Sequence, residues 1–103
     1  MAILHTLQHS FDDQSWLSRA TNSLQSGDGL LLLEDAVSIS CHLPTLEKLN
    51  NLGVDISFYA MDVDLQARGL TPANIPSSVK FEIINYQDFV ELSLQFDKVV
   101  NWA

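Results

Sequence analysis

Cys41 is the most reactive side chain in this sequence, and it is the only cysteine among the 103 residues. A thiolate is a strong nucleophile, and His42 stands next to it as a candidate base. Pro44 predicts that a helix begins just afterwards, and the positive end of a helix favours a thiolate. Neighbouring residues often point in different directions, however, and lone cysteines are commonly buried. Cys41 is therefore a candidate nucleophile, with simple burial as the alternative.

Paired carboxylates form a second group of candidates. Glu34-Asp35 directly follows an apolar run, where two carboxylates would suit acid–base catalysis. No partner for them is identifiable, so the pattern favours Asp35 as the cap of the following turn. Asp12-Asp13 and Asp62-x-Asp64 could attract a cation, but helix capping and solvation explain them better.

Histidines and glycines give weaker signals. His5 and His9 are four residues apart, a spacing that suits a metal only on a helix, whereas these two straddle a predicted strand end. We expect one of them to be partly buried and the other exposed. Gly27-x-Gly29 precedes a strand instead of following one and lacks a third glycine, so it predicts a turn and not a dinucleotide site. The sequence thus predicts no metal and no cofactor.

Aromatic side chains gather late in the chain. A tryptophan so near the end of a short chain has little core left to enter, so it packs on the sheet edge or anchors a partner. We take part of this cluster as interface candidates, namely Tyr86, Phe89, Phe96 and Trp102.

Alternating strand and helix patterns position these residues. Apolar periodicity predicts helices at Leu17–Leu24, at 44–53 and at 86–96, where Asn85 and Asp88 stand at capping spacing and where strand-like alternation is the alternative. The segment Glu34–Leu43 is ambiguous between a loop and a short helix, and 62–69 reads as a polar connection with a helical turn. The predicted strands are Ala2–Leu7, Gly29–Leu33, Val54–Ala60, Val79–Ile84 and Val99–Trp102.

This order predicts the α/β class, as one domain over residues 1–103 with a mostly parallel sheet of four to five strands flanked by helices. Ligand sites in such sheets lie at the carboxyl ends of the strands. The candidate functional edge therefore comprises His5–His9, Glu34–His42, Ala60–Asp64 and Asn85–Asp88.

Composition excludes several classes of function. The net charge is −8 and argues against direct binding of nucleic acid, which rests on Lys and Arg. The longest apolar run, Leu30–Leu33, is too short to span a membrane, and the start of the sequence does not resemble a signal peptide. We expect a soluble, cytoplasmic protein. Hydrophobic residues make up 47% and the mean hydropathy is +0.10, an apolar surplus that predicts burial against partners.

Several segments occur together in a familiar order. They are ILHTL, GDGLLLLEDAV, YAMDVDLQARGL, INYQDFVEL and Trp102, which run from Ile3 almost to the end of the chain. In this combination the sequence resembles the DsrH/TusB family of small sulfur-relay subunits. The resemblance implies a DsrE-like, flavodoxin-like α/β fold. It also implies a heterohexamer with TusC/DsrF-like and TusD/DsrE-like sister subunits, which docks sulfur-carrier proteins.

The resemblance further implies a function. In one branch such a complex passes persulfide sulfur toward 2-thiouridine at the tRNA wobble position, with the essential cysteine on the TusD/DsrE-like subunit and a structural role for the TusB-like one. In the other branch it serves dissimilatory sulfur oxidation. Some DsrH members carry a cysteine in the first helix, but Leu17–Leu24 contains none. This favours the thiolation branch and a non-catalytic subunit, and leaves Cys41 as an alternative persulfide carrier.

Overall fold

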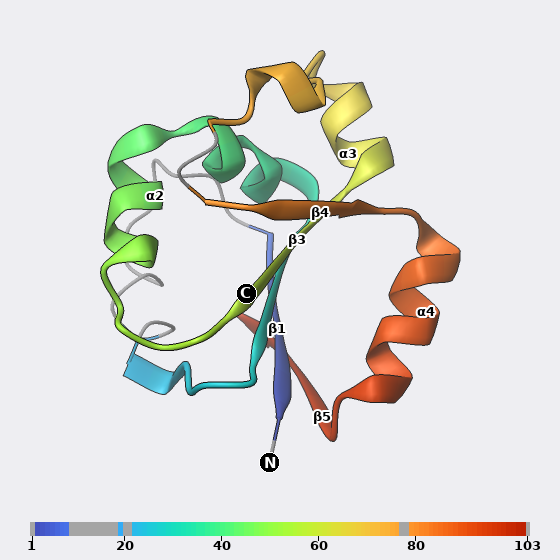
Figure 1. The fold of residues 1–103 in the computed structure, drawn as a ribbon. Helices are drawn as coiled ribbons and strands as arrows, with labels where there is room; N and C mark the ends of the chain where they lie inside the picture. Colours follow the sequence, from blue (N-terminus) through green and yellow to red (C-terminus); the bar gives the residue numbers. More distant parts are fainter. Residues whose placement is uncertain (1, 9–18, 20–21, 77–78, 103) are drawn as a thin grey trace.

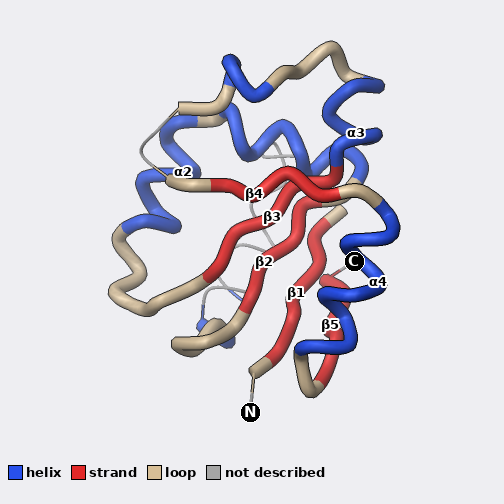
Figure 2. The backbone as a smooth tube through the Cα atoms, turned by 45° about the vertical axis from the view of Figure 1, so that its right-hand side comes forward, coloured by secondary structure: helices blue, strands red, loops and turns tan. Residues whose placement is uncertain are grey.

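Five parallel strands form one sheet in the order β4-β3-β2-β1-β5 (Figure 2). The computed structural model describes residues 2–8, 19, 22–76 and 79–102 of the chain. The sheet confirms the predicted α/β class with a parallel sheet. The strands are β1 (Ile3–Leu7), β2 (Gly29–Leu32), β3 (Ser57–Met61), β4 (Phe81–Ile84) and β5 (Lys98–Trp102).

Helices lie on both sides of this sheet. Figure 1 shows the sheet nearly edge-on, with α2 on one side and α4 on the other. The described helices are the 3₁₀ helices η1 (Glu34–Cys41) and η2 (Pro72–Asn74), and the α-helices α2 (Leu43–Asn50), α3 (Asp62–Ala67) and α4 (Tyr86–Gln95). The predictions for Asp12-Asp13 and His9 lie outside the described residues. Half of the predicted first helix, Leu17–Leu24, also lies outside them, and its described residues 19, 22 and 23 are helical.

Strand β2 sits at the centre, and all four of its residues are buried. Its run of leucines is the pattern of a strand covered on both faces, as the sequence predicted. Leu30 and Leu32 join the core beneath η1 and α2, whereas Leu31 joins Leu4 in the smaller core beneath α4. The period-2 alternation of a strand thus divides one leucine run between two cores.

Helix α4 occupies the segment for which the sequence allowed either a helix or a strand. The Asp88 N–H donates to Asn85 Oδ1 at 2.8 Å, and the Asn85 N–H donates to Asp88 Oδ2 at 3.2 Å. This reciprocal capping box fixes where the helix begins. Leu92 is then buried against the sheet, with Phe89 packed beside it. The helical prediction is confirmed over the strand alternative.

The two glycines before β2 have different roles. Gly27 has a φ of +95°, the left-handed conformation that a turn requires, so the turn prediction is confirmed there. Gly29 is the first residue of β2, and a Cβ on it would lie 2.8 Å from Phe96 Cζ. A side chain at Gly29 would therefore force the Phe96 ring at the end of α4 to shift. No described helix is long and apolar enough to cross a membrane.

Candidate functional site

The carboxyl edge of the sheet carries most of the predicted segments. Helices η1, α3 and α4 begin one or two residues after the last residues of β2, β3 and β4, so Glu34–His42, Ala60–Asp64 and Asn85–Asp88 lie at this edge as predicted. His5 differs, because it lies inside β1 and pairs in register with Leu30. It is buried instead of placed at the open edge.

Cys41 is the last residue of η1 and is partly exposed. Its Sγ lies 3.7 Å from Ser40 Oγ, a long contact even for sulfur. Helix α2 begins two residues later at Leu43, so the predicted position before a helix is correct. The Nδ1 atom of His42 lies 2.8 Å from Thr45 Oγ1, in the first turn of α2. His42 thus contributes to the start of this helix, and a reactive Cys41 stays a prediction.

Of the two carboxylates after β2, Asp35 forms an ion pair with Arg68. Asp35 Oδ1 accepts from Arg68 Nη2 at 2.7 Å and from Arg68 Nε at 3.2 Å. The prediction that Asp35 caps the turn was wrong: Leu33 occupies the N-cap position, without a side-chain cap. Asp35 instead binds η1 to the end of α3. Both partners are solvent-accessible, so this ion pair contributes little to stability.

A buried network that the sequence did not predict links β1, β2 and β5. His5 Nε2 lies 3.0 Å from Asp28 Oδ2, and the Trp102 indole N–H donates to His5 Nδ1 at 2.9 Å. An indole nitrogen can only donate, so His5 Nδ1 must be the acceptor. His5 is therefore a neutral imidazole whose proton resides on Nε2 and is donated to Asp28.

Asp28 is the electrostatic centre of this network. Besides His5, its carboxylate accepts the N–H of Ile3 at 2.9 Å and that of Gln25 at 3.1 Å. Burial raises the pKa of Asp28, but the hydrogen bonds from Ile3, His5 and Gln25 outweigh burial and hold the pKa below its ordinary value. Asp28 is therefore ionised in the folded protein at neutral pH.

Despite its histidine and carboxylate, this network is poorly suited to catalysis. A general base needs a ring nitrogen that reaches substrate. Both nitrogens of His5 have protein partners, and its side chain is 2% exposed. Its role is to hold the first, second and last strands together.

No group of three or more metal-ligating side chains occurs among the described residues. Asp62 Oδ1 accepts the Val63 N–H at the start of α3, and Asp64 Oδ1 lies 4.0 Å from Nη1 of Arg68, the C-cap residue of this helix. Both side chains lie in the first turn of α3, where the helix dipole favours negative charge.

The four predicted interface residues divide between core and surface. Phe89 and Phe96 pack against the core beneath α4, and Trp102 packs against the larger core. Tyr86 is 63% exposed on α4. Two further exposed apolar residues on α4, Val90 and Leu94, did not enter the prediction, because only aromatic residues were considered.

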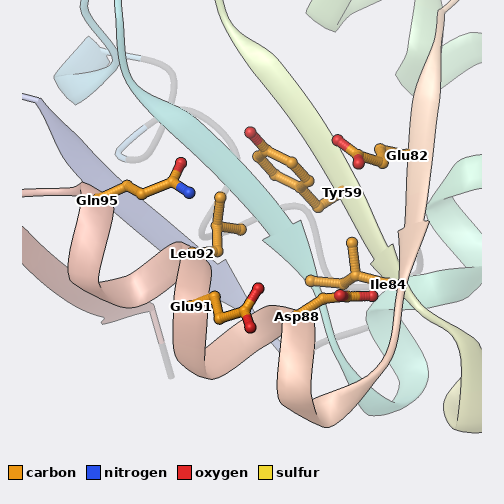
Figure 3. Close-up of a pocket in the computed structure, with 7 residues that line it drawn as sticks. All are labelled: Tyr59, Glu82, Ile84, Asp88, Glu91, Leu92 and Gln95. Carbon is orange, nitrogen blue, oxygen red and sulfur yellow. The ribbon is translucent and has the colours of Figure 1, made fainter.

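An acidic pocket lies between α4 and the β3–β4 edge of the sheet (Figure 3). Its volume is about 190 Å³, and Tyr59, Ile84 and Leu92 form its apolar part. Three carboxylates border it, from Glu82 on β4 and from Asp88 and Glu91 on α4, together with the Gln95 amide. A larger open hollow of about 580 Å³ lies along Ile56–Tyr59 and Lys80–Glu82.

Comparison with known proteins gives a consistent result. The family described as "DsrH like protein" matches residues 9–99. Protein TusB from Serratia proteamaculans is 38% identical, with 97% of this chain and 100% of that protein covered. Protein TusB from Escherichia coli K12 is 36% identical at the same coverage. This chain belongs to the DsrH-like family.

A solved structure supports the fold of this DsrH-like protein. The solution NMR structure of Protein Tm0979 from Thermotoga maritima matches with a TM-score of 0.64 and 20% identity. The match covers 92% of this chain and 93% of Tm0979. At this identity the likeness establishes the architecture alone.

The segments that carried the resemblance have structural roles in the DsrH-like chain. LLLLEDAV contains the centre of β2 and the start of η1, and YQDFVEL is most of α4. Asp28 in GDGL accepts the buried hydrogen bonds that join β1 to β2. A buried aspartate in a turn has no distinctive spacing, so its role could only be found from the structure.

Proposed function

We propose that this DsrH-like protein is a non-catalytic interaction subunit of a TusBCD-like sulfur-relay complex. The observation that carries the proposal is similarity to Protein TusB at 33–38% identity over 97% of the chain. The complex passes persulfide sulfur toward 2-thiolation of the tRNA wobble uridine. Its partners are TusC/DsrF-like and TusD/DsrE-like sister subunits.

The geometry of the described residues supports a role without catalysis. His5 is enclosed by Asp28 and Trp102, and Asp35 is paired with Arg68. The His5 ring is thus closed to a substrate, and Asp35, one of the two carboxylates considered for acid–base chemistry, is held in an ion pair. The working thiol is then on a sister subunit, where a thiolate attacks the outer sulfur of a carrier's persulfide and the carrier's thiolate leaves.

Charge supports a division of labour in that complex. With 13 Asp and Glu against 5 Lys and Arg, this subunit repels the phosphate backbone. It therefore contributes to tRNA modification by completing the complex and shaping the surface where carrier proteins dock, without contacting tRNA.

Co-expression with the two sister subunits from the same genome tests the proposal. We expect one stable complex on size-exclusion chromatography, and tRNA that loses 2-thiouridine when the gene for this subunit is deleted. A chain that stays monomeric beside both sister subunits, or unchanged 2-thiouridine in the deletion strain, would contradict it.

Cys41 supports a second candidate, a direct persulfide carrier, because its thiol is partly exposed at the end of η1. Its thiolate would attack the outer sulfur of a donor persulfide and release the donor thiolate. Mass spectrometry after incubation with a persulfide donor should show one added sulfur, absent in Cys41→Ser. Full 2-thiouridine in a Cys41→Ser strain would exclude an essential carrier role.

A further inference from the structure

Helix α4 presents an apolar stripe to solvent. Tyr86, Val90 and Leu94 are 63%, 59% and 81% exposed and stand four residues apart, so they align along one flank of the helix. Leu92 and Phe89 already hold the opposite flank on the sheet. Isolated exposed apolar residues are normal, but three in line on one helix mark an interaction surface.

The last strand carries a further exposed apolar residue on the side of the sheet that α4 covers. Val99 on β5 is exposed and pairs in register with Leu4, which belongs to the core beneath α4. Register partners in a parallel sheet point to the same face, so the Val99 side chain lies on the face that α4 covers. Figure 2 shows α4 passing in front of β5. Exposed apolar side chains on this side of the sheet therefore come from both a helix and the edge strand.

The charge on α4 determines what kind of partner fits. The helix carries Asp88 and Glu91 and no lysine or arginine. With Glu82, these carboxylates border the pocket on the other flank of the helix (Figure 3). A second copy of this chain carries the same net charge of −8, so like-charge repulsion opposes its approach to this surface. A basic partner gains from the same charges.

The geometry points to the exposed face of α4, with Val99, as the docking surface for a sister subunit whose contact surface has an apolar centre bordered by lysine or arginine. Tyr86, Val90 and Leu94 form the apolar centre on this chain, and a basic side chain of the partner reaches Glu91 at the acidic pocket. This inference rests on the proposed function, since it supplies the surface through which the subunit joins its complex.

Lysine substitutions on the stripe test the apolar part. Val90→Lys and Leu94→Lys should each weaken co-assembly with the two sister subunits at least about tenfold, measured as the dilution at which the complex dissociates. Val63→Lys on α3 and Leu43→Lys on α2 are matched controls, because they change the same residue types at other exposed positions. All four sites are exposed, so unchanged urea midpoints will show that the variants fold.

Neutralising a carboxylate tests the charge. Glu91→Gln should weaken assembly about threefold and reduce its salt dependence, whereas Glu47→Gln on α2 should leave both unchanged. Wild-type assembly by both stripe variants would overturn the docking surface and leave the proposed function standing. Failure of the wild-type chain to assemble would overturn the proposed function itself. If the wild-type chain forms a homodimer that Val90→Lys abolishes, a second copy of the chain occupies this surface. The assignment of the surface to a sister subunit would then be wrong.

Discussion

At the scale of single residues, the buried Asp28 side chain accepts three hydrogen bonds that hold the start of β1 and the turn before β2. Its carboxylate satisfies two backbone N–H groups and the His5 ring. Asp28→Asn replaces one accepting oxygen by an NH₂ group, so at least one buried donor loses its acceptor. We expect unfolding to become easier by about 2 kcal/mol or more in urea denaturation. Asp55→Asn, at an exposed position in the neighbouring loop, should change stability by less than about 0.5 kcal/mol.

The same carboxylate predicts a pH dependence. Because the folded-state pKa of Asp28 lies below its ordinary value of 3.8, its stabilisation is complete above that value. The stabilisation is lost as pH falls further, through the folded-state pKa. The difference in unfolding free energy between wild type and Asp28→Asn should therefore shrink below about pH 4. A difference that stays constant down to pH 2 would contradict this assignment.

Residue types and spacing predicted where a side chain lies in the fold better than they predicted which side chain it contacts. The location of Cys41 before a helix was predictable, since Pro44 marks that helix from sequence. The pairing of Asp35 with Arg68 joins residues 33 positions apart, and that of His5 with Trp102 spans 97. Neither contact has a local signature, because each depends on strand order, which residue spacing does not determine.

At the scale of elements, Gly29 sets how closely α4 approaches the sheet. A Cβ there would lie 2.8 Å from Phe96, 3.1 Å from Leu4 and 3.2 Å from Tyr59. Gly29→Ala should destabilise the protein by about 1–3 kcal/mol through overpacking. Combining it with Phe96→Leu should cost less than the sum of the two single changes, because the smaller side chain makes room. Additive effects in this double-mutant cycle would exclude the steric explanation.

The start of α4 gives a second prediction for an element. Asn85→Ala removes the acceptor for the Asp88 N–H and should destabilise the protein by about 1 kcal/mol. Asn85→Ser keeps an accepting oxygen and should retain most of the stability. Hydrogen exchange should locate the effect in the first turn of α4. Equal losses in both variants would mean that the cap does not matter.

Elements were predictable where local patterns agreed with tertiary packing. The leucine run of β2 and the capping spacing before α4 gave both elements correctly. The segment after β2 could be predicted neither as a loop nor as a helix. Its buried residues Ala36, Val37 and Ile39 lie in a 3₁₀ helix, and the period of such a helix matches neither a strand nor an α-helix. Its geometry follows from packing against the sheet.

At the scale of the whole molecule, exposed apolar side chains and acidic charge occur together on helix α4, along different flanks. Most of the large apolar side chains lie in the two cores, and many of those that remain exposed lie on α4 and β5. The same helix carries carboxylates without compensating basic groups. Composition could predict that the chain joins partners, but only the fold brings α4 and β5 to one face.

The net charge of −8 predicts how the isolated chain responds to salt. Excess like charge opposes the compact state, and added salt screens that repulsion. We expect the urea midpoint to rise between about 0.02 and 0.2 M NaCl, since the Debye length falls below about 10 Å over this range. KCl should act alike, because the effect depends on ionic strength. The complex with a basic partner should respond in the opposite direction, because there salt screens an attraction. A midpoint that falls with salt would mean that attractive pairs such as Asp35–Arg68 outweigh the repulsion.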